Sequence, residues 1–442
     1  MAIGGRKVSN SEHENPLETN IKTLIHKRKI GMRWWLGIIF IFIGLVSYMD
    51  RANMSVVAVP MMKELNMNKV QFGFLASSFF LGYALFQIPS GIISEKFGVR
   101  RIITFAMIWW SIFTALTAAF SSYIFLSLVR FLFGVGEAPL APANAVFNSF
   151  WFQKQEKGRA VSLLLVGQFF GPVIAPGISV ALVAAFGWRS VFYLFAIPGI
   201  VISIFWYIVS RDKPEMHSWV SEYEKNLILT NRDISNADDK RTPWKDFLGN
   251  TQFWAVGLQY FIVVYMTTLF ITWLPTYLIE ARHFSLTKMG VAASFPFLAI
   301  CLLMLAGGVI SDYLIQKGKS LMVARGGLAI TGLIIFIITI NLASLTNNPF
   351  LNVLWLTIAL GSLGLPVVQS WAVANDLGKQ FAGSVSGWMN FLGNIGAVLS
   401  PIICGWTAQQ MGWNIALMIN SVPVLFAAVI WFFIKPDKQL VK

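Results

Sequence analysis

Twelve long apolar stretches alternate with short polar loops along this chain of 442 residues. Each stretch has about 20 residues or more, which is the length that an α-helix needs to cross the hydrocarbon core of a bilayer. They are too long and continuous for the strands of a membrane barrel. The pattern therefore predicts an all-α membrane protein with twelve transmembrane helices. The stretches run at 34–58, 69–93, 101–121, 122–149, 159–183, 187–209, 252–278, 286–311, 322–343, 350–374, 381–407 and 413–434.

One long polar interruption, at residues 211–250, divides the apolar stretches into two groups of six. It mixes charges of both signs and is interpreted as a solvated linker. No cleavable signal peptide is expected, because the first 33 residues are polar and the first apolar run continues past residue 45. The predicted order is a tail at 1–33, a six-helix half at 34–210, the linker at 211–250, a second half at 251–435 and a tail at 436–442.

Composition and charge support this class and predict an orientation. Hydrophobic residues make up 56% of the chain and charged residues 12%, about half the charged fraction of a soluble protein. Of the 34 Lys and Arg residues, 27 lie in the tails and in the loops on the same side, and five lie on the other side. Because cytoplasmic loops carry the excess of positive charge, both termini are predicted to be cytoplasmic. This bias accounts for the net charge of +14 without a nucleic-acid partner.

The two halves resemble each other at matching positions. With a shift of 217 residues, Gly91 aligns with Gly308 and Glu95 aligns with Asp312. Later in the halves, with a slightly larger shift, Pro176 aligns with Pro401. Two parallel six-helix repeats with a site between them are an architecture of secondary transporters.

Four ionisable residues fall well inside the predicted spans, all in the first half: Asp50, Arg51, Arg130 and Glu137. A charge at the bilayer centre costs at least about 2.5–3.5 kcal/mol, so such residues pair, line a wet cavity or carry function. Arg130 and Glu137 are seven residues apart, on one helix face and about 10 Å apart along the axis. That spacing favours two roles in one cavity over a direct pair. A structural set of salt bridges joining the two helices is the alternative.

The residue types in this set favour an anionic substrate, because a guanidinium holds a carboxylate through two parallel hydrogen bonds. The carboxyl groups of Asp50 and Glu137 are predicted to carry the coupling proton. A substrate carboxylate arriving at an arginine weakens the hold of that arginine on Asp50 or Glu137, which links anion binding to protonation. Na⁺ is the alternative coupling ion, since Asp50 and nearby carbonyls offer oxygen ligands for a hard cation. No other cofactor and no metal site are expected, because both cysteines lie inside apolar runs and no histidine lies in a span.

Three segments resemble motifs of the major facilitator superfamily. Gly91-Ile-Ile-Ser-Glu95-Lys96-Phe-Gly98-Val-Arg100-Arg101 is similar to its loop motif between helices 2 and 3, with Glu95 where Asp is usual. Tyr48-Met49-Asp50-Arg51 and the segment from Arg130 to Glu137 resemble two signatures of the anion:cation symporter branch. The likeness covers about residues 34–434 and implies two six-helix bundles. It also implies a cytoplasmic gate formed by Gly91, Glu95, Arg100, Arg101 and Asp312.

That branch includes bacterial proton symporters for hexonates, hexarates and hexuronates. The resemblance therefore implies a secondary active transporter, not an enzyme, that takes up a sugar acid by proton symport through alternating access. It places Asp50 and Glu137 in proton coupling. The implied partners are a small organic anion and the lipid bilayer, and the implied setting is a bacterial inner membrane, with a monomer as the default. The substrate-binding candidates are Tyr48, Arg51, Tyr83, Arg130, Gln168, Ser370, Trp371, Asn390 and Asn394.

Other functions stay open at this point. Met49 and Trp388 are bulky residues near the candidate site and favour a narrower or more apolar cavity, which keeps aromatic and short-chain carboxylates as alternative substrates. Exchange is an alternative to uptake, because Gly167-Gln168-Phe-Phe-Gly171-Pro172 loosely resembles a motif of antiporters. A channel or a membrane sensor is the non-carrier alternative. An ATP-driven pump is rejected, since Gly318-Lys319-Ser320 has Tyr313 in place of the first glycine of a phosphate-binding loop.

Overall fold

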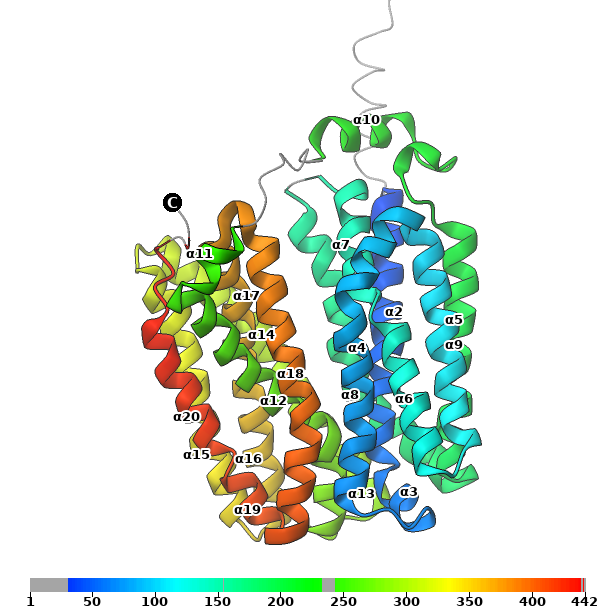
Figure 1. Ribbon diagram of the computed structural model, residues 1–442, viewed down its shortest axis with the longest axis vertical. Helices are drawn as coiled ribbons and strands as arrows, with labels where there is room; N and C mark the ends of the chain where they lie inside the picture. The colour runs from blue at the N-terminus through cyan, green and yellow to red at the C-terminus, as the bar shows by residue number, and fades with distance from the viewer. Residues whose placement is uncertain (1–30, 154, 233–242, 439, 441–442) are drawn as a thin grey trace, which may run out of the picture.

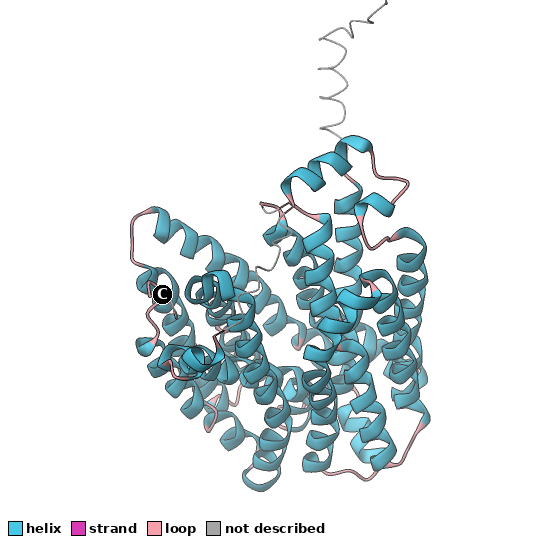
Figure 2. Ribbon diagram, turned by 45° about the horizontal axis from the view of Figure 1, so that its top comes forward, coloured by secondary structure: helices cyan, strands magenta, loops and turns pink. Residues whose placement is uncertain are grey.

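The computed structural model describes residues 31–153, 155–232, 243–438 and 440, and helices joined by short loops make up these ranges (Figure 2). Within them, 12 helical segments are long and apolar enough to cross a membrane. Their ends agree with the predicted apolar runs to within a few residues. The structure therefore confirms the predicted all-α fold class.

Each half contains six of these spans (Figure 1). In the first half they are α2 (Met32–Val56), α4 (Lys69–Phe97), α5 (Val99–Ala119), α6 with α7 (Tyr123–Glu137 and Leu140–Trp151), α8 (Lys157–Phe186) and α9 (Trp188–Val209). In the second half they are α12 (Thr251–Glu280), α13 with α14 (Leu286–Ala292 and Ser294–Gln316), η2 with α15 (Met322–Gly327 and Leu328–Leu345), α16 with α17 (Pro349–Ser362 and Gly364–Gly378), α18 (Ala382–Met411), and α19, α20 and η4 (Trp413–Met418, Ser421–Ile430 and Trp431–Phe433).

Proline explains most of the breaks inside spans. α6 ends at Glu137 and Pro139 precedes α7, while Pro296, Pro366 and Pro423 each lie a few residues beyond a break. Proline has no N–H to donate to the carbonyl four residues earlier, so the helical ladder is interrupted there. The broken spans give the backbone places to bend.

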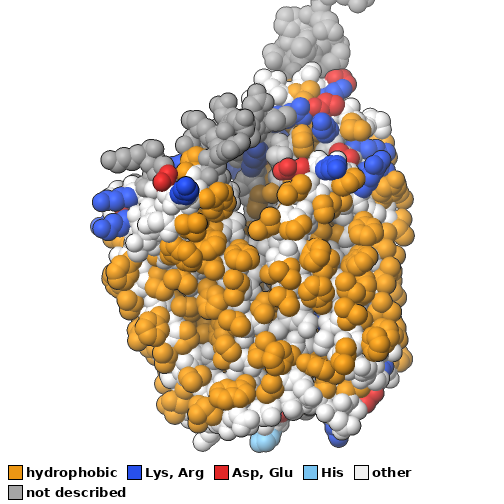
Figure 3. Space-filling view, viewed as in Figure 1, with side chains coloured by type: hydrophobic (Ala, Val, Ile, Leu, Met, Phe, Trp, Pro, Cys, Tyr) orange, Lys and Arg blue, Asp and Glu red, His pale blue; other side chains and the backbone are white. Residues whose placement is uncertain are grey.

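The surface is apolar around its middle. Figure 3 shows hydrophobic side chains covering the central part of the visible face, with Lys, Arg, Asp and Glu gathered toward its two ends. Ile124, Val309 and Phe350 are among the large apolar side chains with 70% or more of their surface exposed. Such a belt is unfavourable in water and suits the hydrocarbon of a bilayer, where the helices satisfy their own backbone hydrogen bonds.

The two six-helix bundles lie side by side and pack most closely at one end (Figure 1). We call the end that carries α10 (Glu222–Asn231) and α11 (Trp244–Leu248) the linker face, and the end that carries α3 (Ala58–Glu64), α13 and α19 the opposite face. Near the opposite face, the Lys69 ammonium of α4 lies 3.0 Å from the Glu280 carboxylate of α12. The ribbons of the two halves draw apart toward the linker face (Figures 1 and 2).

Further contacts between the halves run along α4 and α18 and along α8 and α14. Ser77 donates a hydrogen bond to the Val398 carbonyl. On the second pair of helices, Ser294 donates to the Val173 carbonyl and the Cys301 thiol lies 3.4 Å from the Phe169 carbonyl oxygen. Gly73 allows the closest approach, because a Cβ there would lie 2.5 Å from the Pro401 carbonyl oxygen.

The first part of the linker is fastened to the first half. Arg33, at the start of α2, lies 2.9 Å from both the Glu156 and the Glu224 carboxylates. His217 follows η1 (Pro214–Met216), and its Nε2 lies 2.8 Å from the Val209 carbonyl oxygen. Burial holds the pKa of His217 below its usual value. Residues 233–242 of the predicted linker lie outside the described residues.

Candidate functional site

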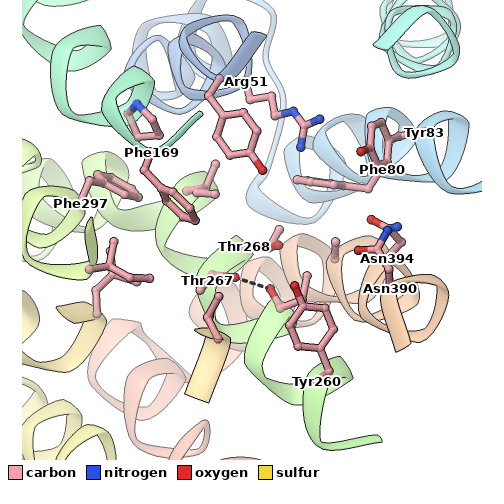
Figure 4. A pocket seen from close by; sticks show the side chains of 18 residues that line it. Arg51, Phe80, Tyr83, Phe169, Tyr260, Thr267, Thr268, Phe297, Asn390 and Asn394 are labelled. Atoms are coloured by element: carbon pink, nitrogen blue, oxygen red, sulfur yellow. Dashed lines mark hydrogen bonds between the residues drawn. The ribbon is translucent and has the colours of Figure 1, made fainter. Parts of the chain in front are cut away.

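A cavity of about 160 Å³ lies between the two halves. α2, α4 and α8 line it from the first half, and α12, α14 and α16–α18 line it from the second. Figure 4 shows the labelled Phe169 and Phe297 on one side and Tyr83, Asn390 and Asn394 on the other. The lining residues are Tyr48, Arg51, Phe80, Tyr83, Phe169, Pro172, Tyr260, Val264, Thr267, Thr268, Ile271, Phe297, Ile300, Leu360, Val367, Asn390, Asn394 and Ala397.

Arg51 is the one Lys, Arg, His, Asp or Glu among these lining residues of the described chain. Its Nε lies 2.7 Å from Oε2 of Glu137 on α6. Its guanidinium carbon also lies 4.5 Å from the ring centroid of Tyr48 and 4.7 Å from that of Tyr83. Aromatic faces attract a cation electrostatically, so the rings and Glu137 together hold the guanidinium at the cavity wall.

Behind Arg51 the first half contains a buried polar cluster, formed by Asp50, Arg130 and Glu137. Asp50 and Glu137 are fully buried and Arg130 is 2% exposed. Both carboxylate oxygens of Asp50, Oε1 of Glu137, and Nε and Nη1 of Arg130 have no hydrogen-bond partner among the described residues. Leaving buried polar atoms unpaired is costly. The unpaired atoms of this cluster are therefore available to bind a proton or a water molecule, or to form a rearranged ion pair.

The seven-residue spacing of Arg130 and Glu137 does not place both side chains in the main cavity. Arg130 packs over the rings of Phe133 and Phe79, at 4.4 and 5.6 Å from their centroids. It meets a separate space of about 20 Å³ that Arg51 also lines, which is large enough for about one water molecule. Glu137 contacts the main cavity only through its ion pair with Arg51.

The second half lines the cavity with neutral polar groups. Tyr260, Thr267 and Thr268 come from α12, while Asn390 and Asn394 come from α18. Both asparagine Nδ2 groups donate to Oε1 of Gln87 on α4, at 3.0 and 2.9 Å. Gln87 Nε2 in turn donates to the Tyr83 hydroxyl at 3.3 Å. This amide cluster of Gln87, Asn390 and Asn394 joins the two halves at the cavity wall.

Three other predicted substrate-binding residues lie outside the cavity lining. Trp371 is one step behind it, since its Nε1 donates to the Tyr260 hydroxyl at 3.0 Å. Ser370 is fully buried and exchanges hydrogen bonds with the Gln259 amide. Gln168 is 7% exposed on α8 and is absent from the lining. In this conformation these side chains support the wall rather than form it.

The bulky residues expected to narrow the site do not line it. Met49 packs against the apolar core, and the Trp388 ring stacks on Phe253 with 5.2 Å between ring centroids. The apolar part of the wall comes instead from residues that include Phe169 and Phe297. The expectation of a partly apolar cavity is met by different side chains.

The predicted gate residues lie near the linker face and in separate halves. Glu95, Arg101 and Asp312 are exposed. The Arg100 backbone N–H donates to the Asp212 carboxylate at 2.8 Å, and its Nε donates to the Tyr207 carbonyl at 2.8 Å. Gly91 lies next to Pro142, so a Cβ there would meet the Pro142 Cβ at 3.6 Å. This structure does not bring the two copies of the motif together.

Sequence reasoning missed several lining residues that a helical pattern predicts. On α12, Tyr260, Val264, Thr267 and Ile271 recur at intervals of three to four residues, which places them on one helix face. Tyr260 is the α12 tyrosine that lines the cavity. In the part of the chain that is described, no group of three or more His, Cys, Asp or Glu side chains could hold a metal ion.

Comparison with known proteins supplies the family context for this geometry. Residues 40–401 match the sequence model of the Major Facilitator Superfamily. The chain is 30% identical over 434 residues to the probable galactarate/D-glucarate transporter GarP of Escherichia coli, covering 93% of this chain and 96% of that protein. It is also 30% identical over 432 residues to the probable galactarate/D-glucarate transporter GudP of Bacillus subtilis, covering 94% of each chain.

More distant similarities extend to other substrates and to solved structures. The chloroplastic ascorbate transporter of Arabidopsis thaliana is 30% identical over 403 residues, covering 90% of this chain and 74% of that protein. The crystal structure of a bacterial homolog of the human lysosomal transporter Spinster, inward-facing and unoccupied, has a TM-score of 0.76. It covers 91% of this chain and 96% of its own at 18% identity, so it supports the fold alone.

Proposed function

The chain belongs to the Major Facilitator Superfamily, and from this premise we propose that it takes up an organic anion, a sugar acid in the first instance, by proton symport. The family and the near-full-length relatives are transporters rather than enzymes, and the chain is a multi-pass inner-membrane protein. Relatives in two bacteria are named for galactarate and D-glucarate. A sugar acid of the hexonate, hexarate or hexuronate kind is therefore the first substrate class to test.

One observation carries the proposal: Arg51 lines the cavity and also holds Glu137 at 2.7 Å. A substrate carboxylate that binds the Arg51 guanidinium competes with Glu137 for the same donors. Glu137 then loses part of its ion pair in a buried place, where an unpaired carboxylate is costly. Uptake of a proton removes that cost, so anion binding and proton binding favour each other.

Asp50 is the second proton carrier in this proposal. Both its oxygens lack a hydrogen-bond partner among the described residues, and it belongs to the same buried cluster as Arg130. Arg130 serves as a second cation that stabilises whichever carboxylate is ionised. In this role it acts on the substrate through Glu137 and Asp50 rather than by contact.

The way in which the halves meet supports alternating access. The contacts near the opposite face, such as the Lys69–Glu280 ion pair, hold that side together while the ribbons separate toward the linker face. In the proposed cycle these contacts break and the gate residues Gly91, Glu95, Arg100, Arg101 and Asp312 close the linker face. Because both termini are predicted to be cytoplasmic, we assign this structure to the inward-facing state of the cycle.

The test is uptake of labelled galactonate, glucarate and glucuronate into proteoliposomes, with and without an inward proton gradient. Na⁺-gradient and no-gradient arms separate the two coupling ions. Glu137→Gln should lose gradient-driven uptake and keep counterflow, because the amide cannot carry the proton. Glu215→Gln is the matched control, since Glu215 pairs with Arg232 in the linker. Absence of uptake of all three acids by folded protein would overturn the sugar-acid proposal.

Import of an aromatic carboxylate is the second candidate. Phe169 and Phe297 form an apolar side of the cavity opposite Asn390 and Asn394 (Figure 4), and an aromatic ring would bury well there. Benzoate and phthalate in the same uptake assay would separate this function from sugar-acid import.

A further inference from the structure

The cavity has one cationic end and one neutral end. Arg51 supplies the charge, and the phenols of Tyr48 and Tyr83 lie beside it as further donors. In the second half, Tyr260, the hydroxyls of Thr267 and Thr268, and the amides of Asn390 and Asn394 line the cavity. We infer that this transporter selects substrates with a single carboxylate, bound at Arg51, and an uncharged hydroxyl-bearing end, bound at Asn390 and Asn394. This inference rests on the proposed import of a sugar acid and narrows its substrate class.

No second cation in the described chain is placed to receive another carboxylate in the cavity. Arg130 is 2% exposed and meets only the 20 Å³ space, which holds about one water and not a carboxylate group. In the second half the basic residues occupy the ends of spans or the loops. Arg325, the deepest of them along its span, pairs with Asp376 at 3.3 Å. A dicarboxylate would therefore leave one charge desolvated without an ion pair, which is costly.

The amide cluster suits hydroxyl groups. Each asparagine gives one N–H to Gln87 and keeps a carbonyl oxygen and one N–H for a ligand. A hydroxyl group can donate to the carbonyl and accept from the N–H, whereas a carboxylate only accepts. The carbonyl oxygens of Asn390, Asn394 and Gln87 in one place would repel a second carboxylate.

Two matched pairs of acids test this inference on the unmodified protein. Gluconate and glucarate differ in one end, a CH₂OH group against a carboxylate, and galactonate and galactarate differ in the same way. Half-inhibitory concentrations would be measured against a labelled acid that the protein takes up, at neutral pH, where sugar carboxylates are ionised. We expect each dicarboxylate to be about 30-fold weaker or more, as for a buried charge left unpaired.

A gain of function provides the second measurement. Asn394→Lys places a cation at the neutral end and should raise the glucarate-to-gluconate uptake ratio about 10-fold. Asn394→Leu has a similar size and no charge, and should weaken gluconate without improving glucarate. Should Asn394→Lys fail to fold, the ratio of the unmodified protein still decides the matter.

The outcomes separate this inference from the proposed function. Equal or tighter binding of the dicarboxylates overturns the single-carboxylate inference and leaves sugar-acid import in place. Uptake of none of the four acids overturns sugar-acid import and the inference with it. Preference for gluconate and galactonate supports both, and marks a substrate class that differs from the one for which the bacterial relatives are named.

Discussion

The first half of the molecule brings charge to the cavity and the second half brings neutral hydrogen-bonding groups. The internal repeat makes the contrast direct. The 217-residue shift that aligns Gly91 with Gly308 also aligns Asp50-Arg51 with Thr267-Thr268, and Arg51, Thr267 and Thr268 all line the cavity. The same place in the fold thus carries an ion pair in one repeat and two hydroxyls in the other. The superfamily architecture supplies the position. In the function that we propose, the side chains there decide whether a half couples to protons or recognises the neutral end of the substrate.

The largest expected effect comes from removing Arg51. Arg51→Ala should lower uptake about 100-fold, because hydrogen bonds to a charged group contribute up to about 3 kcal/mol. The repeat-matched control, Thr268→Ala, should lower uptake only a few-fold. Initial uptake rates into proteoliposomes, normalised to folded protein, compare the two. Equal losses of uptake in the two variants would contradict the different roles that we propose for the two halves.

The same contrast should appear in stability. Arg51→Ala leaves Glu137 buried without its ion pair, which should cost about 3–5 kcal/mol, and Arg51→Ala/Glu137→Ala should recover part of that loss. In the second half, Ser370→Ala removes a neutral hydrogen bond to Gln259 and should cost about 1 kcal/mol. Unfolding in detergent, followed by tryptophan fluorescence, measures all three. A single variant as stable as its double partner would contradict the ion pair.

A substitution of Asn394 tests the contribution of the second half. Asn394→Ala should raise the KM for a sugar acid about 10-fold, since one neutral hydrogen bond is worth about 1.4 kcal/mol at most. The ratio of protons to substrate should stay unchanged, because the coupling groups lie in the first half. Parallel measurement of substrate and proton flux tests this expectation. A changed ratio would assign coupling to the second half as well.

Breaking a contact between the halves should have a smaller effect. The Lys69–Glu280 pair is partly exposed, with side-chain exposures of 25% and 28%, so it contributes about 0–1 kcal/mol. Lys69→Gln should favour opening of the opposite face by at most about fivefold. Reactivity of a cysteine introduced at Ser77, which is 3% exposed and donates to the Val398 carbonyl of the other half, reports that opening. Lys63→Gln on α3 is the matched surface control and should leave the reactivity unchanged.

The smallest effect concerns pH. Hydrogen bonds from Arg189 and Trp188 hold the pKa of Glu64 below its ordinary value of 4.5. Because the folded value is the lower one, this contribution to stability is fully present above pH 4.5 and is lost as the pH falls through the folded value. Glu64→Gln should flatten the acid limb of a plot of Tm against pH. An unchanged acid limb would contradict the role of these hydrogen bonds.

The sequence predicted the positions of the helices better than it predicted the contacts between side chains. Span positions followed from apolar length, because lipid leaves little alternative to helices. The buried charges were visible for the same reason, and Arg51, Tyr48, Tyr83, Asn390 and Asn394 do line one cavity. The partners of those charges were not predictable. Which carboxylate meets Arg51 depends on how α2 and α6 are placed relative to each other, and that placement depends on contacts between helices distant in sequence.

The residues that lie behind the cavity lining were also not predictable from the sequence. Periodicity puts Ser370, Trp371 and Gln168 on plausible faces, but a helix rotation of about 100°, the step between neighbouring residues, separates a lining residue from a supporting one. Gln87 illustrates the reverse error, because it is not among the residues predicted from the sequence and the structure places it in the amide cluster. Neutral residues leave no mark comparable to a charge in an apolar run, so their roles emerge only from the fold.

The contact between Cys301 and the Phe169 carbonyl gives the molecule a built-in chemical reporter. Cys301 is 7% exposed and sits where α14 meets α8, and Cys404 is 1% exposed inside the second half. When the two halves separate at the opposite face, the Cys301 thiol should become open to a maleimide while Cys404 stays covered. The rate at which a thiol reagent labels Cys301 in the unmodified protein should therefore report how often the opposite face opens.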